Sequence, residues 1–309
     1  MLTFRSSCAI FIYVVNTLPR QSENELKQVE GKEIMKKLIA LLLAGCMMAT
    51  MVVGCGAKEE PAEAPAAAEE TVEADSDLAY VKEKGVLVVG ITDFAPMDYK
   101  NEEGEWIGFD ADMAKFFAGE LGVEVEFVEI DWDNKILELD AKSIDCVWNG
   151  MTLTDEVKAA MDCSNPYCNN AQVVIVPTKD AQDYQTVESL EGLAFAVEAG
   201  SAGEAEVTAL GLDCTPVKAQ SDALMEVAAG TSDAAVIDAL MAAAMVGPET
   251  GYADLTYTVS LNSEEYGVGF RKGSDLVAEL NAFFAEIYAD GTMQEIAATY
   301  GVDAAVVAQ

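Results

Sequence analysis

The chain has 309 residues, of which 51% are hydrophobic, with 54 acidic and 18 basic residues and no histidine. This apolar content allows a sizeable buried core, so the chain is not a disordered polymer. The excess of negative charge excludes an electrostatic grip on nucleic acid, which requires lysine and arginine to neutralise phosphates, and it disfavours adhesion to anionic lipid. The absence of histidine removes histidine acid–base chemistry and histidine metal ligands.

Residues 1–34 fit neither an export signal nor a domain. Residues 30–34 back-translate into a purine-rich run of nucleotides just before the codon of Met35, which is the pattern of a ribosome-binding site. The sequence therefore predicts that translation begins at Met35 and that 1–34 is a miscalled start.

Residues 35–54 have the pattern of a secretory signal peptide, with two lysines followed by a short apolar run. The run is too short to span a membrane comfortably as a mature helix. It ends before Cys55 in a sequence that resembles the bacterial lipobox, so Cys55 is the expected lipidation site, and an ordinary thiol is the alternative. The rest of 55–79 is rich in alanine, glutamate and proline, which is typical of a flexible acidic tether.

From Tyr80 the sequence alternates between buried-type apolar runs and amphipathic stretches, which predicts strands and helices in turn. The first set has strands at 86–89, 123–130, 145–149 and 171–176, with helices at 111–121 and near 132–139. The second set has strands at 193–197 and 234–237, with helices at 203–210, 223–229 and 241–246. The chain then returns through 266–270 to helices at 276–289 and 293–300. This alternation implies parallel pairing with right-handed crossovers, and hence an α/β fold.

Short segments of this region also match the motifs of a known family. They read GVLVVG at 85–90, GFD at 108–110, GMTLTDE at 150–156 and YGVGFRKG at 266–273, followed by ADGT at 289–292 and YG at 300–301. In this order and at these intervals they resemble the family 3 extracellular solute-binding proteins, the polar amino acid receptors of ABC importers. The resemblance covers roughly 80–301, nearly the entire expected domain.

The resemblance implies a two-lobed fold of the type II periplasmic-binding-protein kind, with a mainly parallel sheet flanked by helices in each lobe. Lobe 1 would take 80–172 and 265–309, and lobe 2 would take 173–264. The chain would cross between them at hinges near 172–178 and 264–270.

The implied function is that of a receptor and not of an enzyme. It would capture a small-molecule ligand, without a cofactor or a metal, and present it to an ABC permease with its ATPase. We expect a monomer on the extracellular face of the cell membrane, held there through its lipid anchor only.

In such folds the ligand lies at the carboxyl ends of strands, where helix N-termini offer unpaired amide groups. The matching positions in lobe 1 follow strands or end them: Asp93, Phe94, Trp132, Asn149, Gly150 and Thr152. Those in lobe 2 are the end of a strand, a small-residue turn before a helix, and an acidic residue after an apolar strand: Glu198, Ser201, Ala202, Gly203 and Asp238. The acidic members would supply charge, and the two aromatic members would supply a stacking surface.

Three of these positions also fit a structural role. Asp93 fits a turn-capping aspartate equally well, and Trp132 fits a tryptophan that packs a helix. Asp238 fits a surface helix cap, although the apolar strand before it favours the ligand-binding interpretation.

The sequence departs from the family pattern at Val157. Relatives that bind α-amino acids usually carry an arginine there, whose guanidinium donates two hydrogen bonds to the ligand carboxylate. The side chain of valine has no hydrogen-bond donor. Glu198 stands where some relatives carry a cation, and Arg271 belongs to the returning segment. A carboxylate held only by neutral amides would lose a charge-assisted bond worth roughly 1.5–3 kcal/mol. We therefore hypothesise a cationic or carboxylate-free ligand, such as an amine, a quaternary ammonium or an amino-acid derivative with a masked carboxylate.

Two alternatives stay open. The first is an ordinary amino acid whose carboxylate is held by Thr152 and by the amides of 201–203. The second is a dehydratase-like enzyme of the same fold, against which stand the absence of histidine and the scarcity of cationic groups that would stabilise an anionic transition state.

An exported domain permits disulfides. Cys146 lies on a buried-type strand and is expected in the core. Cys163 and Cys168 flank a turn that could let them bridge, and the sequence leaves this pairing open. The same pair has no further ligands nearby in the sequence, so it is too weak to indicate a metal site.

Overall fold

The structure is a computed structural model that describes residues 76–309. The expected miscalled start, the signal peptide, Cys55 and nearly all of the tether lie outside the described residues. Within 76–309, no helix combines the length and the apolar composition that a membrane crossing requires.

The first sheet has six strands, which are β1 (Val86–Ile91), β4 (Glu124–Glu129), β5 (Cys146–Thr152), β6 (Asp162–Cys163), β7 (Cys168–Asn170) and β13 (Glu264–Phe270). Their order is β4-β1-β5-β13-β6, and β7 also pairs with β13. The helices of this lobe are α3 (Asp77–Lys84), α4 (Phe109–Leu121), η1 (Trp132–Asn134), α5 (Lys135–Asp140), α6 (Asp155–Ala160), α10 (Leu276–Ala289), α11 (Thr292–Tyr300) and η4 (Asp303–Ala305). A small hairpin joins β2 (Tyr99–Lys100) to β3 (Trp106–Ile107).

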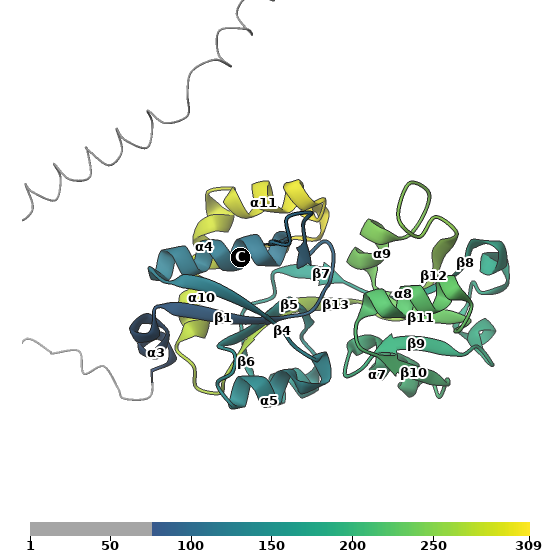
Figure 1. Ribbon diagram of the computed structural model, residues 1–309, viewed down its shortest axis with the longest axis horizontal. Helices are drawn as coiled ribbons and strands as arrows, with labels where there is room; N and C mark the ends of the chain where they lie inside the picture. Colours follow the sequence, from purple (N-terminus) through teal and green to yellow (C-terminus); the bar gives the residue numbers. More distant parts are fainter. Residues whose placement is uncertain (1–75) are drawn as a thin grey trace, which may run out of the picture. The chain divides into compact units, whose positions relative to one another are not determined.

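The second sheet has the order β10-β9-β11-β8-β12. Its strands are β8 (Gln172–Pro177), β9 (Phe195–Glu198), β10 (Cys214–Val217), β11 (Ala234–Asp238) and β12 (Leu255–Ser260). The helices of this lobe are α7 (Ala202–Ala209), α8 (Gln220–Ala229) and α9 (Ala239–Met245), with the short turns η2 (Thr178–Asp183) and η3 (Val187–Leu190). The two sheets lie in separate lobes (Figure 1), which confirms the predicted two-lobed α/β fold.

Each sheet is mixed, with less parallel pairing than the sequence predicts. β1 is parallel to β4 and β5, and β9 is parallel to β10 and β11. The strands that carry the chain across, β8 and β13, run antiparallel to their neighbours. A strand that arrives from the other lobe enters a sheet at the end where the parallel strands finish, so it must run in the opposite direction.

The folded part begins at Asp77, three residues before the expected boundary at Tyr80. Ser76 caps helix α3, because its hydroxyl oxygen accepts a hydrogen bond of 2.9 Å from the Ala79 amide. Asp77 is buried and lies 2.9 Å from Nη2 of Arg271. Residues 77–79 therefore belong to the first lobe and not to a tether.

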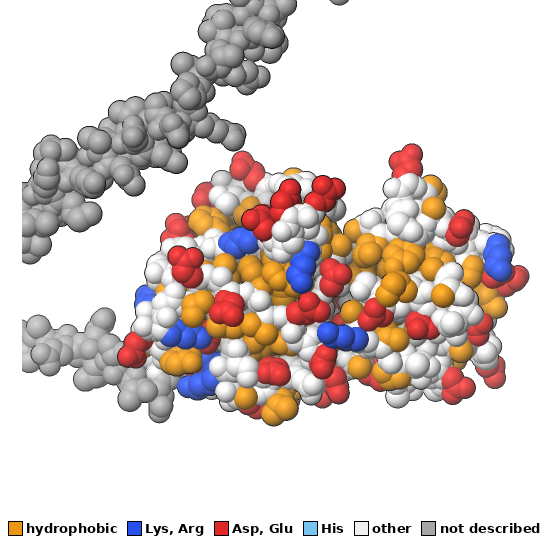
Figure 2. All heavy atoms as spheres, viewed as in Figure 1, with side chains coloured by type: hydrophobic (Ala, Val, Ile, Leu, Met, Phe, Trp, Pro, Cys, Tyr) orange, Lys and Arg blue, Asp and Glu red, His pale blue; other side chains and the backbone are white. Residues whose placement is uncertain are grey.

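Strand β5 positions the site through the alternation of its side chains. Trp148 points into the core, where its ring centroid lies 5.6 Å from that of Phe284 and 6.3 Å from that of Phe117. Asn149 therefore points to the opposite side of the strand. Acidic side chains are spread over the visible face of both lobes (Figure 2), in keeping with the negative net charge.

Candidate functional site

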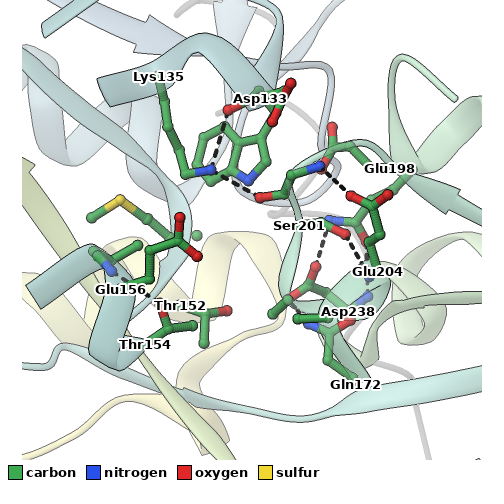
Figure 3. Close-up of a pocket in the computed structure, with 18 of the residues that line it drawn as sticks. Asp133, Lys135, Thr152, Thr154, Glu156, Gln172, Glu198, Ser201, Glu204 and Asp238 are labelled. Atoms are coloured by element: carbon green, nitrogen blue, oxygen red, sulfur yellow. Dashed lines mark hydrogen bonds between the residues drawn. The ribbon is translucent and has the colours of Figure 1, made fainter. Parts of the chain in front are cut away.

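A cavity of about 720 Å³ is lined by residues of both lobes (Figure 3). Nine of the eleven predicted site residues line it: Phe94, Trp132, Asn149, Gly150, Thr152, Glu198, Ser201, Ala202 and Asp238. They come from the ends of strands β5, β9 and β11 and from the segments that follow β1, β4 and β9. The structure therefore brings together most of the residues that the resemblance implied.

The other two predicted residues, Asp93 and Gly203, are not among the residues that line the cavity. Asp93 is exposed while the next side chain, that of Phe94, is buried, because successive side chains of an extended segment point to opposite sides. Partial desolvation of its carboxyl and the neighbouring Glu129 raise the pKa of Asp93. Gly203 instead allows helix α7 to pack closely, since a Cβ there would lie 3.0 Å from Oε1 of Gln172.

The aromatic ring of Phe94 is fixed by the residues around it. It packs edge to face on Tyr266, with ring centroids 6.3 Å apart. Gly150 has a φ of +53°, and a Cβ at this position would lie 2.5 Å from the Phe94 ring. Glycine at 150 is thus required by both its backbone conformation and this close contact.

The side-chain amide of Asn149 has all its hydrogen bonds within the protein. Its oxygen accepts from the amide of Thr92 at 3.0 Å and from the hydroxyl of Thr92 at 2.8 Å. Its nitrogen donates to the carbonyl of Thr92 at 3.1 Å and to Oδ2 of Asp98 at 2.8 Å. Asn149 therefore holds the segment after β1 in place at the edge of the cavity.

Helix α6 begins at the cavity and presents an apolar residue to it. The hydroxyl oxygen of Thr154 caps the helix by accepting from the Val157 amide at 3.1 Å. Val157 and Glu156 both line the cavity, and Val157 is 5% exposed. The position at which the resemblance implies an arginine is therefore at the cavity surface, without a hydrogen-bond donor on its side chain.

Lys135 is one of the lining residues that the sequence did not predict, and it is the basic one. Its ammonium donates to the carbonyl of Gly200 in the other lobe at 2.9 Å and to the carbonyl of Trp132 at 3.2 Å. It also lies 4.9 Å from the centroid of the Trp132 ring, so one face of this ring is already covered by a cation. Burial lowers the pKa of Lys135, and the nearby Glu198 opposes this shift. The spacing of Trp132 and Lys135 indicates this contact, because residues three apart on a helix lie on the same side.

In lobe 2, most backbone amides of the turn after β9 already donate hydrogen bonds to groups of the same turn. The amide of Gly200 donates to the carboxylate of Glu204 at 2.7 Å, and the amide of Glu204 donates to the hydroxyl of Ser201 at 3.1 Å. The amide of Ser201 donates to the carbonyl of Glu198 at 3.2 Å. The carboxylate of Glu204 thus already occupies an anion position at the start of α7.

Glu198 ends strand β9 and is 2% exposed. Its Oε1 is buried and has no hydrogen-bond partner among the described residues. Burial, together with the neighbouring charge of Asp238, raises the pKa of Glu198 to about 8, and Lys135 and Thr92 oppose this shift.

Asp238 ends strand β11 and has several donors. Its Oδ1 accepts from the hydroxyl of Tyr266 at 2.6 Å, from Nε2 of Gln172 at 3.1 Å, and from Nδ2 of Asn170, while its Oδ2 accepts from Nε2 of Gln220. Burial and the charge of Glu264 raise the pKa of Asp238 to about 7, and the hydrogen bonds limit this rise.

Acidic side chains outnumber basic ones in the cavity lining. Among the described residues, Lys135 is the only basic one that lines the cavity. Six acidic residues line it: Asp133, Asp155, Glu156, Glu198, Glu204 and Asp238. Arg271 lies elsewhere, where its Nε donates to Asp77 at 3.0 Å and its Nη1 donates to the carbonyl of Ile144 at 2.8 Å. No arginine of the described residues is therefore available to the cavity.

The cysteines of the described residues are all free. Cys163 and Cys168 lie in strands β6 and β7 and are not joined by a disulfide in this structure. Cys146 is fully buried in the core, as predicted.

Two lobes that contribute strand ends and helix starts to one cavity define a two-domain ligand-binding protein. A sequence profile of the bacterial extracellular solute-binding proteins, family 3, matches residues 87–303. The chain belongs to this family, as its motifs predict, and the family is one of solute-binding proteins and not of enzymes.

Several relatives are known by the molecule they bind. The chain is 30% identical over 223 residues to the L-cystine-binding protein TcyJ of Escherichia coli strain K12, covering 71% of this chain and 84% of the relative. It is 29% identical over 271 residues to the arginine-binding extracellular protein ArtP of Bacillus subtilis strain 168, covering 85% and 96%. A solved ABC uptake transporter substrate binding protein from Streptococcus pneumoniae, with bound histidine, has a TM-score of 0.69 at 30% identity, covering 75% and 98%.

Proposed function

We propose that this chain is the substrate-binding component of an ABC importer and that it captures a small, amino-acid-like solute that is cationic or lacks a free carboxylate. The names of the relatives support an amino-acid-like size. The main observation in favour of a ligand without a carboxylate is that Val157 lines the cavity. Amino acid receptors of the family usually carry a carboxylate-binding arginine at this position.

The electrostatics of the lining favour the same ligand. Six carboxyl side chains line the cavity with one lysine, so the lining repels an anionic ligand and attracts a cation. The raised pKa values of Glu198 and Asp238 reduce this negative charge near pH 7 without reversing it. Two hydrogen bonds of the Lys135 ammonium are already made to carbonyl oxygens, which leaves one N–H of three. A single donor cannot reproduce the paired hydrogen bonds of a guanidinium.

The alternative is an ordinary amino acid whose carboxylate is bound by Thr152 and the amides of 201–203. This alternative is weakened because the amide of Ser201 is used within its own turn and the carboxylate of Glu204 lies at the same helix start. The hydroxyl of Thr152 in turn donates to Glu264 at 2.9 Å. Only the amides of Ala202 and Gly203 remain without a partner in this turn of the described structure.

The attachment and movement of the receptor are part of the same proposal. Cys55 would carry the lipid, and 55–76 would separate the folded part from the membrane. The crossings into β8 and β13 would act as hinges, so that lobe 2, over 173–264, closes on lobe 1, over 77–172 and 265–309. We propose that the closed monomer then delivers its ligand to the permease.

The test is isothermal titration of the secreted protein with the twenty amino acids beside a panel of amines, amino-acid amides and quaternary ammonium compounds. We expect saturable binding of at least one cation without a carboxylate, together with a rise in melting temperature, because a ligand of the folded state stabilises it. Tighter binding of a free amino acid than of its amide would contradict the proposal.

A further inference from the structure

The two carboxylates that end the strands of lobe 2 at the cavity have opposite surroundings. A carboxylate offers about four lone-pair positions to hydrogen-bond donors. Asp238 already accepts from four side chains, with Asn170, Gln172 and Tyr266 donating to Oδ1 and Gln220 donating to Oδ2. Glu198, at 2% exposure, has a buried Oε1 with no partner in the part of the chain that the structure describes.

The donors on Asp238 come mostly from the strands that cross between the lobes. Asn170 ends β7, Gln172 begins β8, and Tyr266 lies in β13. Nδ2 of Asn170 and Nε2 of Gln172 also donate to Oε1 of Glu264, at 2.6 and 2.8 Å. Asp238 and Glu264 therefore share two amide groups and join both crossings into one network, which is a structural task.

Glu198 has no comparable set of donors among the described residues. The ammonium of Lys135 donates to the carbonyls of Trp132 and Gly200. Thr92 is the one side chain of 76–309 whose hydrogen bond lowers the pKa of Glu198, and Oε1 of Glu198 stays without a partner there. A buried carboxylate oxygen without a donor is unfavourable, and a hydrogen bond from a cation removes this penalty. Glu198 also lines the cavity, so a ligand can supply that donor.

We infer that Glu198, and not Asp238, receives the positive group of the ligand, that this group carries N–H, and that Asp238 is a positioning residue for the crossing strands. This inference rests on the proposed function and narrows it. An ammonium or a guanidinium donates to the unpartnered Oε1, whereas a quaternary ammonium has no hydrogen to donate. The Trp132 ring, which would hold a quaternary ammonium by stacking, is covered on one face by Lys135.

The experiment compares four proteins by isothermal titration: the wild type, Glu198→Gln, Asp238→Asn and Glu191→Gln. Glu191 is an exposed glutamate of the same lobe, so its substitution controls for the loss of one negative charge. The probes are agmatine and 1,5-diaminopentane, which are N–H cations without a carboxylate, and choline, which has no N–H.

We expect the wild type to bind an N–H cation at least tenfold more tightly than choline. Glu198→Gln should lose about a hundredfold in affinity for that cation, and Glu191→Gln should lose nothing. Asp238→Asn should lose less than tenfold in affinity but unfold at a lower temperature. If the wild type binds the cation and Glu198→Gln binds it within threefold, the inference is wrong while the proposed function stands.

A second readout needs no variant. Because the pKa of Glu198 is about 8, its carboxyl is mostly protonated at pH 7, and a bound cation must displace that proton. Titrations of the wild type in buffers of different ionisation enthalpy should therefore show close to one proton released per cation bound. Proton release near zero would contradict the inference, and a wild type that binds none of the cations would overturn the proposed function itself.

Discussion

The ammonium of Lys135 lies 2.9 Å from the carbonyl oxygen of Gly200, so the only basic side chain in the described lining of the cavity joins the two lobes. Lys135 belongs to α5 of the first lobe, and Gly200 belongs to the turn after β9 of the second. Close packing accompanies this hydrogen bond, since a Cβ at Gly200 would lie 2.7 Å from Cα of Asp133. The lobes therefore touch at the cavity itself.

The contact predicts an effect on lobe closure. Lys135→Met removes a hydrogen bond from a charged donor, a class of bond worth about 1.5–3 kcal/mol, so we expect the ratio of open to closed molecules to rise about tenfold or more. Small-angle X-ray scattering without ligand should show a larger radius of gyration than for the wild type. Lys82→Met, at an exposed position on α3, is the matched control, and equal radii for both variants would contradict the role of Lys135.

Val157→Arg should change the ligand preference. The new guanidinium would lie at the cavity surface, where charge-assisted hydrogen bonds to a carboxylate are worth about 1.5–3 kcal/mol. We expect affinity for at least one free amino acid to rise roughly ten- to a hundredfold in isothermal titration. Val157→Gln separates charge from size and should give little gain. If Val157→Arg gives no gain in affinity, the absence of a guanidinium at this position does not determine the ligand specificity.

Stability should fall as the pH rises from 5.5 to 8.5. Burial raises the pKa of Glu198 to about 8 and that of Asp238 to about 7, above the ordinary values of 4.5 and 3.8. A carboxyl that holds its proton more tightly when folded stabilises the protein below its unfolded pKa, and this contribution is lost as the pH rises through the folded pKa. Melting curves should show this fall, and Glu198→Gln should raise the melting temperature at pH 8.5 by roughly 5 °C or more. A flat profile for both proteins would contradict the assigned shifts.

Asp77→Ala should destabilise the protein without weakening ligand binding. Arg271 is buried, and Asp77 supplies its closest carboxylate, with Asp145 3.5 Å away as the remaining partner. Removal of one member of a buried pair costs about 3–5 kcal/mol, so the melting temperature should fall by about 6–20 °C. Glu83→Ala on the same helix should leave it unchanged. If Asp77→Ala instead loses more ligand affinity than its lower stability accounts for, Arg271 belongs to the ligand site.

The sequence predicts the fold better than it predicts the chemistry of the site. Strand β1 is an apolar run and β11 is apolar up to Asp238, and amphipathic helices such as α10 have a clear periodicity, so local pattern identifies them. The start of α3 was missed because Asp77 belongs to an acidic stretch and its partner Arg271 is 194 residues away. Contacts of that separation leave no mark on local sequence pattern.

The site residues show the same division. The resemblance placed Glu198 and Asp238 at the cavity, Glu198 where some relatives carry a cation and Asp238 where relatives carry the acidic residue that binds the α-amino group. It gave no sign of their different hydrogen bonding. Their difference depends on Asn170, Gln172 and Tyr266, which the crossings bring to Asp238 and not to Glu198. Lys135 was missed because a lysine on a short helix usually marks a solvated side, and only the packing of lobe 2 against α5 buries it.

A crystal structure of the protein with the ligand that copurifies from its own cells would locate the positive group of the ligand. We expect an N–H group of that ligand about 3 Å from Oε1 of Glu198, with no carboxylate against Val157. A ligand carboxylate bound by Lys135 and the amides of Ala202 and Gly203, with Glu198 protonated and without a ligand contact, would contradict it.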